Sequence, residues 1–382
     1  MRLALLCLDD SIPFGGTRNG SIRLRSEAEA WLRAGHHVTA IVSNPGPPQP
    51  VDDLRVLGLE VRRLLPAADT EDIEGLLVSS RVTHVCERLS PRSGHGALAA
   101  SRLGLTHFYE VHSQIKSDSR PTNGKSDADL ARVLLRAAFE CSHGAIAVSH
   151  ELAVWTRSVA PTGYPVAVVP GGVPRRFFDA PDPKLYRSLI PAWLRGGASL
   201  RVGFVGSLSP SHDLSALVHA AALVSRRRPV QVVIVGDGPQ RNQLLIAADR
   251  RGVPVHLVGD VPHSHVHVHL AAMDVMVAPF ASRELDRVPL ALGEAMAAAR
   301  PVVASAVRPV LELLDHEQTG LLVEPGDVHG LAASVERLAA DATLAARLGV
   351  AARLRVRNRT WDQAAAEMVE ALLSWPALPA PI

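Results

Sequence analysis

The sequence predicts two α/β domains, each built on a doubly wound parallel sheet. Short apolar runs rich in β-branched residues recur along all 382 residues, and a helical pattern follows each run. The runs are apolar on both faces, which is typical of strands buried inside a parallel sheet. Their alternation with helices indicates right-handed βαβ units, and the chain is long enough to bury two cores.

The individual elements follow from these runs. The predicted strands cover residues 3–8, 38–43, 84–87, 107–111 and 145–148 in the first half, and 202–205, 230–235, 255–258, 275–278 and 301–304 in the second. The helices between them are amphipathic. One example has apolar residues at helical spacing, namely Leu214, Leu217, Val218 and Ala221.

The two domains are expected to meet near residue 170. Proline and glycine gather at 170–174, 181–183 and 195–197, a composition typical of a linker. We therefore assign residues 1–169 to a first domain and 170–355 to a second. A final helix, within about 356–382, is expected to return to the first domain.

Composition excludes several classes of protein. The net charge of +2 gives no field of the kind that marks a nucleic-acid binder. The three cysteines are scattered, which argues against a disulfide framework and favours the cytoplasm. The apolar run at 3–8 is too short for a signal peptide, and no run approaches the length that spans a bilayer.

Two further patterns could indicate a ligand site, but neither is interpreted as one. Arg23, Arg25 and Arg33 lie in a predicted helix beside apolar residues, which allows at most a peripheral contact with anionic lipid. A solvated helix face explains them better. Histidines alternate along 263–269, and helical pairs could be drawn from them, but they have too few partner ligands, so no metal is expected.

Residues suited to bind a nucleotide lie after strands of the second half. Gly236 and Gly238 form a turn between a strand and a helix, where backbone can approach a ligand closely. A tight structural turn explains them equally well. Pro289 is well placed to start a helix, which puts Glu294 near its anion-binding end. There a carboxylate can accept hydrogen bonds from both ribose hydroxyls while the helix N-terminus holds a diphosphate.

Several segments, in order along almost the whole chain, resemble the retaining glycosyltransferases of family 4. They are residues 86–89, 109–112, 169–173, 205–210, 235–239, 294–297 and 300–305. The resemblance implies the GT-B fold, in which two Rossmann-like domains face each other across a cleft. It also implies that the second domain holds a nucleoside diphosphate sugar and the first domain holds the acceptor.

The resemblance assigns roles around the donor. Glu294 matches the second carboxylate of the family's paired-Glu motif, which binds the nucleotide ribose. Asp286 stands where the first Glu is found, eight residues earlier, and is one methylene shorter; Glu284 is a neighbouring substitute. Leu290 and Ala291 would offer backbone N–H groups to the diphosphate.

The sequence departs from the family where basic residues often neutralise the diphosphate. Those positions are Ser207 and His212 here, and the family's glycine in a later turn is Ala299. Arg287, with Arg283 or Arg308, is a hypothetical source of the missing charge, and a surface role for it is equally open.

In the first domain, Gly15 and Gly16 resemble the family's flexible loop over the donor phosphate and the acceptor. His112 ends a strand and by resemblance contacts the transferred sugar or orients the acceptor; a locally hydrogen-bonded histidine is the alternative. The expected acceptor-binding residues are Glu87, Arg88 and Glu110.

The predicted function is the transfer of a sugar from a nucleoside diphosphate sugar, UDP by default, with retention of configuration. The acceptor is a hydroxyl or amine of a glycan, glycolipid or specialised metabolite. In the family's chemistry the leaving phosphate takes the acceptor proton, so neither a protein nucleophile nor a metal or other cofactor is expected. A homodimer is left open. The alternatives are a non-catalytic partner subunit, a sugar-nucleotide epimerase and a non-glycosidic coupling enzyme on the same fold.

Overall fold

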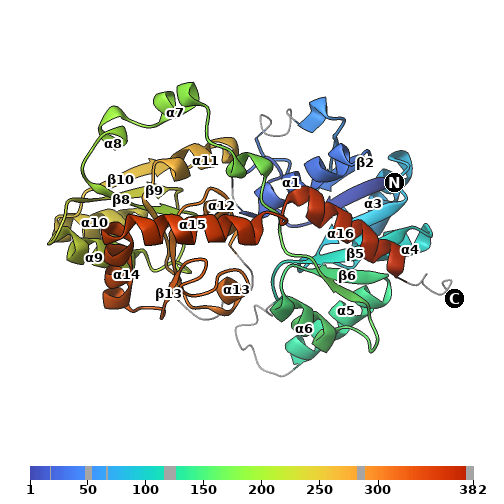
Figure 1. Ribbon diagram of the computed structural model, residues 1–382. Coiled ribbons are helices and arrows are strands. Elements are labelled where there is room, and N and C mark those ends of the chain that lie inside the picture. The colour runs from blue at the N-terminus through green and yellow to red at the C-terminus, as the bar shows by residue number, and fades with distance from the viewer. Residues whose placement is uncertain (18, 48–53, 66–67, 116–125, 282–288, 376–382) are drawn as a thin grey trace. The chain divides into compact units, whose positions relative to one another are not determined.

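The computed structural model describes residues 1–17, 19–47, 54–65, 68–115, 126–281 and 289–375. The chain forms two compact units (Figure 1). Unit 1 comprises Met1–Gly171 together with the C-terminal segment Trp361–Ile382, and unit 2 comprises Gly172–Thr360. The division lies two residues beyond the boundary placed at 169/170.

Unit 1 is built on a parallel sheet with the order β3-β2-β1-β4-β5-β6-β7 in its described residues. The strands are β1 (Arg2–Cys7), β2 (His37–Val42), β3 (Glu60–Arg63), β4 (His84–Arg88), β5 (Thr106–Val111), β6 (Gly144–Ala147) and β7 (Val166–Val168). The order reverses between β1 and β4, as in doubly wound folds, and the carboxyl ends of strands at such a point are where ligands bind.

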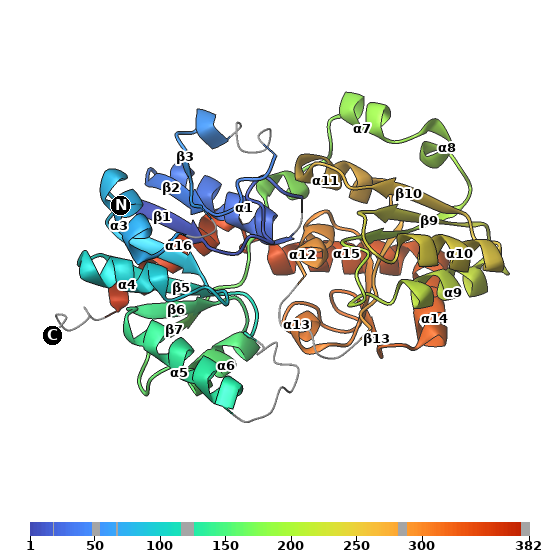
Figure 2. The same cartoon turned by 180° about the vertical axis from the view of Figure 1, so that it is seen from behind.

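Helices cover both faces of this sheet (Figures 1 and 2). They are α1 (Asn19–Arg33), α3 (Thr70–Ser79), α4 (His95–Arg102), α5 (Ser126–Glu140), α6 (His150–Val159) and α16 (Trp361–Ser374). Helices α1 and α16 pack together on one face, and α3 and α4 on the other. Because both faces are covered, the central strands are buried on both sides.

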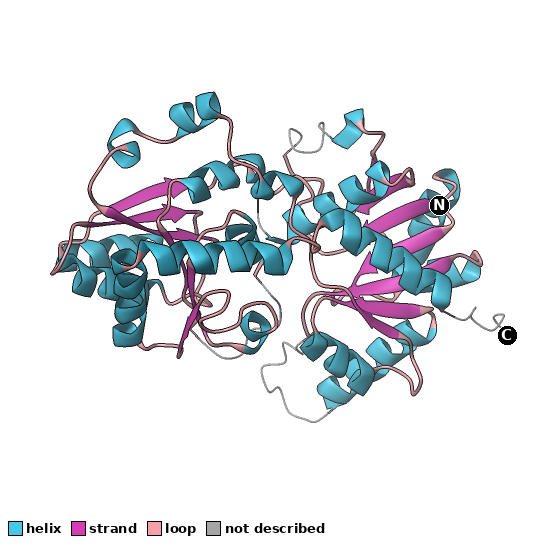
Figure 3. Ribbon diagram, in the orientation of Figure 1, coloured by secondary structure: helices cyan, strands magenta, loops and turns pink. Residues whose placement is uncertain are grey.

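Unit 2 repeats this plan of a sheet with helices around it (Figure 3). The strand order is β10-β9-β8-β11-β12-β13 in the part that the structure describes. Its strands are β8 (Leu200–Val205), β9 (Val230–Val235), β10 (Val255–Gly259), β11 (Val275–Ala278), β12 (Val302–Ser305) and β13 (Leu321–Val323). Its helices are η1 (Arg175–Phe178), α7 (Pro183–Leu189), α8 (Ala192–Arg195), α9 (Leu214–Ser225), α10 (Arg241–Arg251), α11 (His263–Ala271), α12 (Leu290–Ala297), α13 (Arg308–Leu311), α14 (Val328–Ala340) and α15 (Ala342–Val356).

The predicted doubly wound α/β architecture is confirmed, and the sequence missed three strands. The missed strands are β3, β7 and β13, each at an edge of its sheet. Strand β3 reads Glu-Val-Arg-Arg and is largely exposed, so it carries no apolar run. The return of the chain to unit 1 begins at Trp361 rather than near 356, because α15 continues to Val356 and packs on α12 of unit 2.

Helix length and apolarity also bear on membrane insertion. Within the described residues, no helix combines the length and the apolar character needed to cross a membrane.

Two turns at the carboxyl ends of β8 and β9 are joined through backbone. The Gly206 N–H donates to the Val235 carbonyl at 3.0 Å, and the Leu208 N–H donates to the Asp237 carbonyl at 3.0 Å. Gly236 has a φ of 128°, and a Cβ at this position would lie 2.0 Å from the Gly206 carbonyl oxygen. Contact between the turns therefore requires glycine at position 236, whatever ligand binds there.

We predict that Gly236→Ala lowers the free energy of unfolding of unit 2 by about 2–3 kcal/mol, because backbone must move to admit the methyl group. Gly252→Ala is the matched control, since Gly252 also has a positive φ, of 64°, but has open space around it. It should cost about 1 kcal/mol. Urea unfolding monitored by circular dichroism measures both. Equal losses would show that the contact between the turns contributes nothing.

Candidate functional site

The N-terminus of α12 is the centre of the candidate site in unit 2. Pro289 caps the helix in an extended conformation, so α12 begins at Leu290. The N–H groups of Leu290 and Ala291 are in the first turn, where they have no partner within the helix. Glu294 is the fifth residue of α12 and is only 4 % exposed. The helix thus offers N–H donors at its start and a carboxylate one turn later.

Glu294 is held by residues outside its own helix. The Nε2 atom of His263, the first residue of α11, lies 2.5 Å from Glu294 Oε1. The Nδ1 atom of the same ring lies 3.1 Å from Nη2 of Arg176, in η1. No sequence pattern predicts this contact, because the three residues are far apart in the chain.

His212 lies in the turn after β8, where the family often has basic residues. Its ring lies between Phe204 and Phe280, with centroids 5.1 Å and 5.2 Å away. Burial lowers the pKa of His212, and an interaction with the Ser207 backbone opposes that shift only in part. His212 is therefore neutral at pH 7, and Ser207 is an exposed, uncharged residue. Their assignment to the donor stays a prediction.

Four residues predicted to lie near the donor fall within 282–288, outside the described residues. They are Arg283, Glu284, Asp286 and Arg287. Arg308, the other candidate cation, begins α13 and is exposed. Ala299, where the family has glycine, has a φ of 52°, in the left-handed region that favours glycine.

A cluster of buried charges lies in unit 1 between α1 and the ends of β4 and β5. Arg23 Nη2 lies 2.8 Å from Glu110 Oε1, and Arg23 Nε lies 2.7 Å from Glu27 Oε1. His112 Nε2 is 2.8 Å from Glu110 Oε2. Arg88 is also buried, and it lies opposite Glu110 in the register of the two neighbouring strands β4 and β5.

The protonation states in this cluster follow from burial and neighbouring charge. Burial, reinforced by the nearby charge of Arg88 and opposed by that of Glu110, lowers the pKa of His112 to about 3. Burial raises the pKa of Glu110, but His112 and Arg23 outweigh it and hold that pKa well below its usual range. Because His112 is neutral, the cation that keeps Glu110 ionised is Arg23. Burial, reinforced by the charge of Glu110, raises the pKa of Glu27.

The prediction that Glu87 binds the acceptor together with Arg88 and Glu110 is not supported by the structure. Neighbouring strand residues point to opposite faces, so Glu87 lies on the other side of the sheet from Arg88. Its Oε2 is 3.0 Å from His107 Nε2, and both side chains are fully buried. A Cβ on Gly96 of α4 would lie 2.4 Å from Glu87 Oε2. Glu87 is a core residue beneath α4.

Of the basic residues of α1, Arg33 is exposed, as a solvated face predicts, but Arg23 and Arg25 do not lie on the solvated or lipid-facing surface that the sequence suggested. Arg23 is buried in the charge cluster, and Arg25 Nη1 donates to the Gly16 carbonyl at 2.7 Å. Arg33 pairs with Glu29 and Asp362. The loop at Gly15 and Gly16 is therefore tied to α1 through Arg25.

The alternating histidines of α11 do not converge on one point. His263 faces Glu294, and His267 contacts the ring of Phe177 at 6.0 Å between centroids. His269 is buried, which lowers its pKa to about 4. Within the described residues, the one group with three ligand atoms close enough for a metal is Glu27, Glu110 and His112. The Arg23 guanidinium already neutralises that group.

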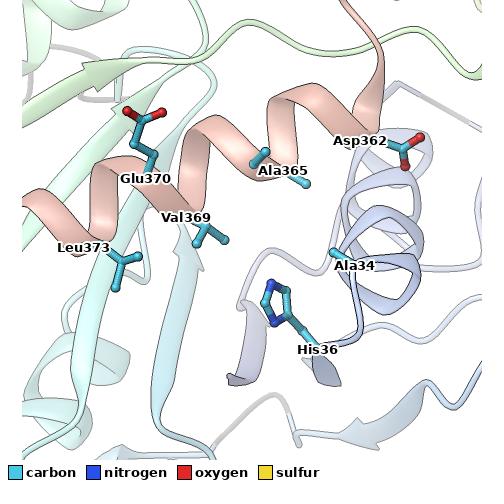
Figure 4. Close-up of a pocket in the computed structure, with 8 residues that line it drawn as sticks. Ala34, His36, Asp362, Ala365, Val369, Glu370 and Leu373 are labelled. Atoms are coloured by element: carbon cyan, nitrogen blue, oxygen red, sulfur yellow. The ribbon is translucent and has the colours of Figure 1, made fainter.

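A surface pocket of about 370 Å³ lies in unit 1, between the end of α1 and α16 (Figure 4). Ala365, Val369 and Leu373 of α16 form its apolar side, and His36 lies opposite them. It contains none of the predicted site residues.

Comparison with known proteins shows which family and which fold the chain resembles. The family model described as glycosyl transferases group 1 matches residues 199–341. The chain is 28 % identical to the GDP-mannose-dependent alpha-(1-6)-phosphatidylinositol monomannoside mannosyltransferase of Mycobacterium tuberculosis, over 90 % of this chain and 85 % of that one. It is 33 % identical to the alpha-D-kanosaminyltransferase of Streptomyces kanamyceticus, over only 38 % of each chain. Anabaena HepE, solved in complex with UDP, has the same fold, with a TM-score of 0.78 at 17 % identity over 98 % of this chain and all of HepE.

We predict different costs for neutralising the two carboxylates of the unit 1 cluster. At pH 7, Glu27→Gln should lower the free energy of unfolding by less than about 1 kcal/mol, because Arg23 keeps its partner Glu110. Glu110→Gln should cost about 3–5 kcal/mol, because it leaves Arg23 buried without a full counter-charge. Urea unfolding measures both.

The pH dependence provides a second check on the same pair. A group whose pKa is raised by folding stabilises the folded state at low pH, and this stability is lost as pH rises through the pKa of the folded state. The free energy of unfolding of the wild type should therefore fall as Glu27 loses its proton. Glu27→Gln should not show this loss. A pKa lowered by folding gives stability that is lost as pH falls, which is the behaviour expected from Glu110. An identical decline in the free energy of unfolding with rising pH in the wild type and in Glu27→Gln would contradict the assignment.

Proposed function

This chain belongs to the group 1 glycosyltransferases of the GT-B fold, and we propose that it transfers a sugar from a nucleoside diphosphate sugar with retention of configuration. The acceptor is a hydroxyl or amine of a glycan, glycolipid or specialised metabolite. The observation that carries the proposal is the start of α12, where first-turn N–H groups with no partner within the helix precede a buried carboxylate by one turn. That arrangement suits a diphosphate joined to a ribose.

In this proposal the helix N-terminus holds the anionic part of the donor. Backbone N–H groups of Leu290 and Ala291 donate to diphosphate oxygens, and the helix dipole favours their negative charge. Glu294 accepts hydrogen bonds from the two ribose hydroxyls. The turns at Gly236 and Gly238 allow backbone to lie close to the nucleotide.

The chemical step that we propose is the one that the resemblance to the family implies. The bond between the anomeric carbon and the diphosphate breaks as the acceptor oxygen or nitrogen bonds to the same face of that carbon. The leaving phosphate takes the acceptor's proton, so no protein nucleophile, metal or other cofactor enters the step. His112, neutral and with its Nε2 atom 2.8 Å from Glu110 Oε2, is suited to contact a sugar hydroxyl. Arg88 and Glu110 are the proposed acceptor-side residues, and Asp286 and Arg287 the proposed sugar and diphosphate contacts.

An experiment can identify the nucleobase of the sugar donor directly. UDP is the base that we propose first, because it is common in the family that the sequence resembles. The name of the mycobacterial relative specifies GDP-mannose, so GDP-mannose is the competing donor. The measurement therefore uses UDP-sugars and GDP-mannose in parallel.

One observation favours a second function. His212 is packed between two phenylalanine rings and is neutral, so it supplies no charge to a leaving diphosphate. A protein lacking that charge could serve as a non-catalytic partner of an active transferase. Binding of a nucleotide sugar without turnover by any acceptor or water would favour this function over transfer.

We predict that Glu294→Ala lowers kcat/KM for the donor by about 100-fold, because hydrogen bonds from the ribose to a buried carboxylate are lost. The readout is release of nucleoside diphosphate from the donor, measured with the wild type and the variant. Glu317→Ala is the matched control, since Glu317 is half exposed and pairs with Arg337 on the surface. Near-wild-type turnover by Glu294→Ala would overturn the site.

A further inference from the structure

Three side chains of unit 2 form a continuous line from the surface of η1 to the candidate site. Arg176 of η1 contacts His263 of α11, and His263 contacts Glu294 of α12. The distances are 3.1 Å from Arg176 Nη2 to His263 Nδ1 and 2.5 Å from His263 Nε2 to Glu294 Oε1. The His263 and Glu294 side chains are only 9 % and 5 % exposed.

The chemistry of the three groups determines the direction of both hydrogen bonds. A guanidinium has donors and no acceptor, so Arg176 must donate and His263 Nδ1 must accept. The imidazole proton is then on Nε2, which donates it to Glu294 Oε1. Arg176 thus selects the tautomer in which His263 can hold the carboxylate.

Packing fixes the plane of the His263 ring. The ring of Phe177, which is fully buried, lies 5.5 Å from the His263 ring between centroids and is inclined to it by 38°. The guanidinium carbon of Arg176 lies 5.8 Å from the same phenylalanine ring. Because Phe177 contacts both neighbours, rotation of His263 away from Glu294 would disturb the core of unit 2.

The hydrogen bond leaves Glu294 able to bind a ligand. A carboxylate has about four acceptor positions, and His263 uses one of them. Holding one oxygen fixes the rotation of the carboxylate plane, which determines where the other acceptor positions point. A pair of adjacent hydroxyls needs two acceptors in a fixed geometry, so the orientation of this group matters more to a diol than to a single hydroxyl.

We propose that His263 is a positioning residue that orients Glu294 toward the ribose diol of the donor nucleotide, with Arg176 setting its tautomer. The proposal rests on the role given above to Glu294. It assigns His263 no contact with the nucleotide itself. It therefore predicts a loss of discrimination for the diol and not a general loss of nucleotide binding.

The experiment compares two pairs of nucleotides, and the members of each pair differ only in the diol. Isothermal titration calorimetry gives the affinity of each protein for UDP and for 2′,3′-dideoxy-UDP, and for GDP and 2′,3′-dideoxy-GDP. The ratio of the two affinities is the diol preference, and it cancels effects common to both nucleotides. His263→Leu, which removes both hydrogen bonds, should lower this preference about tenfold.

Two variants separate positioning from packing. His263→Gln keeps an amide that can donate to Glu294, so it should recover much of the diol preference that His263→Leu loses. His267→Leu is the matched control one turn along α11, because His267 contacts Phe177 but not Glu294. It should keep the wild-type preference. Circular dichroism and thermal unfolding verify that each variant is folded.

The outcomes distinguish this inference from the proposed function. If the wild type binds both members of each pair equally, the role of Glu294 in the proposed function is wrong. If the wild type prefers the diol and His263→Leu keeps that preference, the inference alone is wrong. If His263→Leu does not fold, Arg176→Met provides the second test, since loss of its donor frees the tautomer and should reduce the preference. An unchanged preference in Arg176→Met would then overturn the inference.

Discussion

A buried carboxylate must be matched by donors that are themselves held in place, and this constraint shapes both candidate sites. In unit 2, Glu294 is held by His263, whose other nitrogen accepts from Arg176. In unit 1, Glu110 is held by Arg23 and by the neutral ring of His112. An uncompensated charge at either place would cost several kcal/mol. Each carboxylate is therefore fixed before any ligand arrives, which reduces the ordering that binding requires.

The two parallel sheets provide the places where these groups meet. In such sheets the carboxyl ends of all strands lie at one edge, so residues distant in sequence converge there. The turns after β8 and β9 are joined so closely that Gly236 cannot carry a side chain. Glycine in these turns thus lets the two turns approach each other, apart from the ligand contact that we propose for it.

The faces of a strand separate residues that are adjacent in sequence. Glu87 and Arg88 look like one polar motif, but Glu87 pairs with His107 beneath α4, whereas Arg88 lies with Glu110 on the face covered by α1. The arginines of α1 show the converse effect. They look like a cationic surface, yet Arg23 and Arg25 are bound inside unit 1. Sequence spacing alone does not say which neighbours a charged side chain will find.

The sequence by itself determined the α/β class, the alternation of buried strands with helices, the start of α12 next to Pro289 and the resemblance that includes Glu294. These features depend on local propensity and on periodicity, which neighbouring residues carry. It missed β3, which carries no apolar run, and it missed β7 and β13, whose apolar runs are only three residues long. Only the tertiary structure brought Arg176, His263 and Glu294 into contact. It also buried Glu87 in the core and lowered the pKa of His212. These features depend on how the elements pack, because packing determines burial and the partners that lie far apart in the chain.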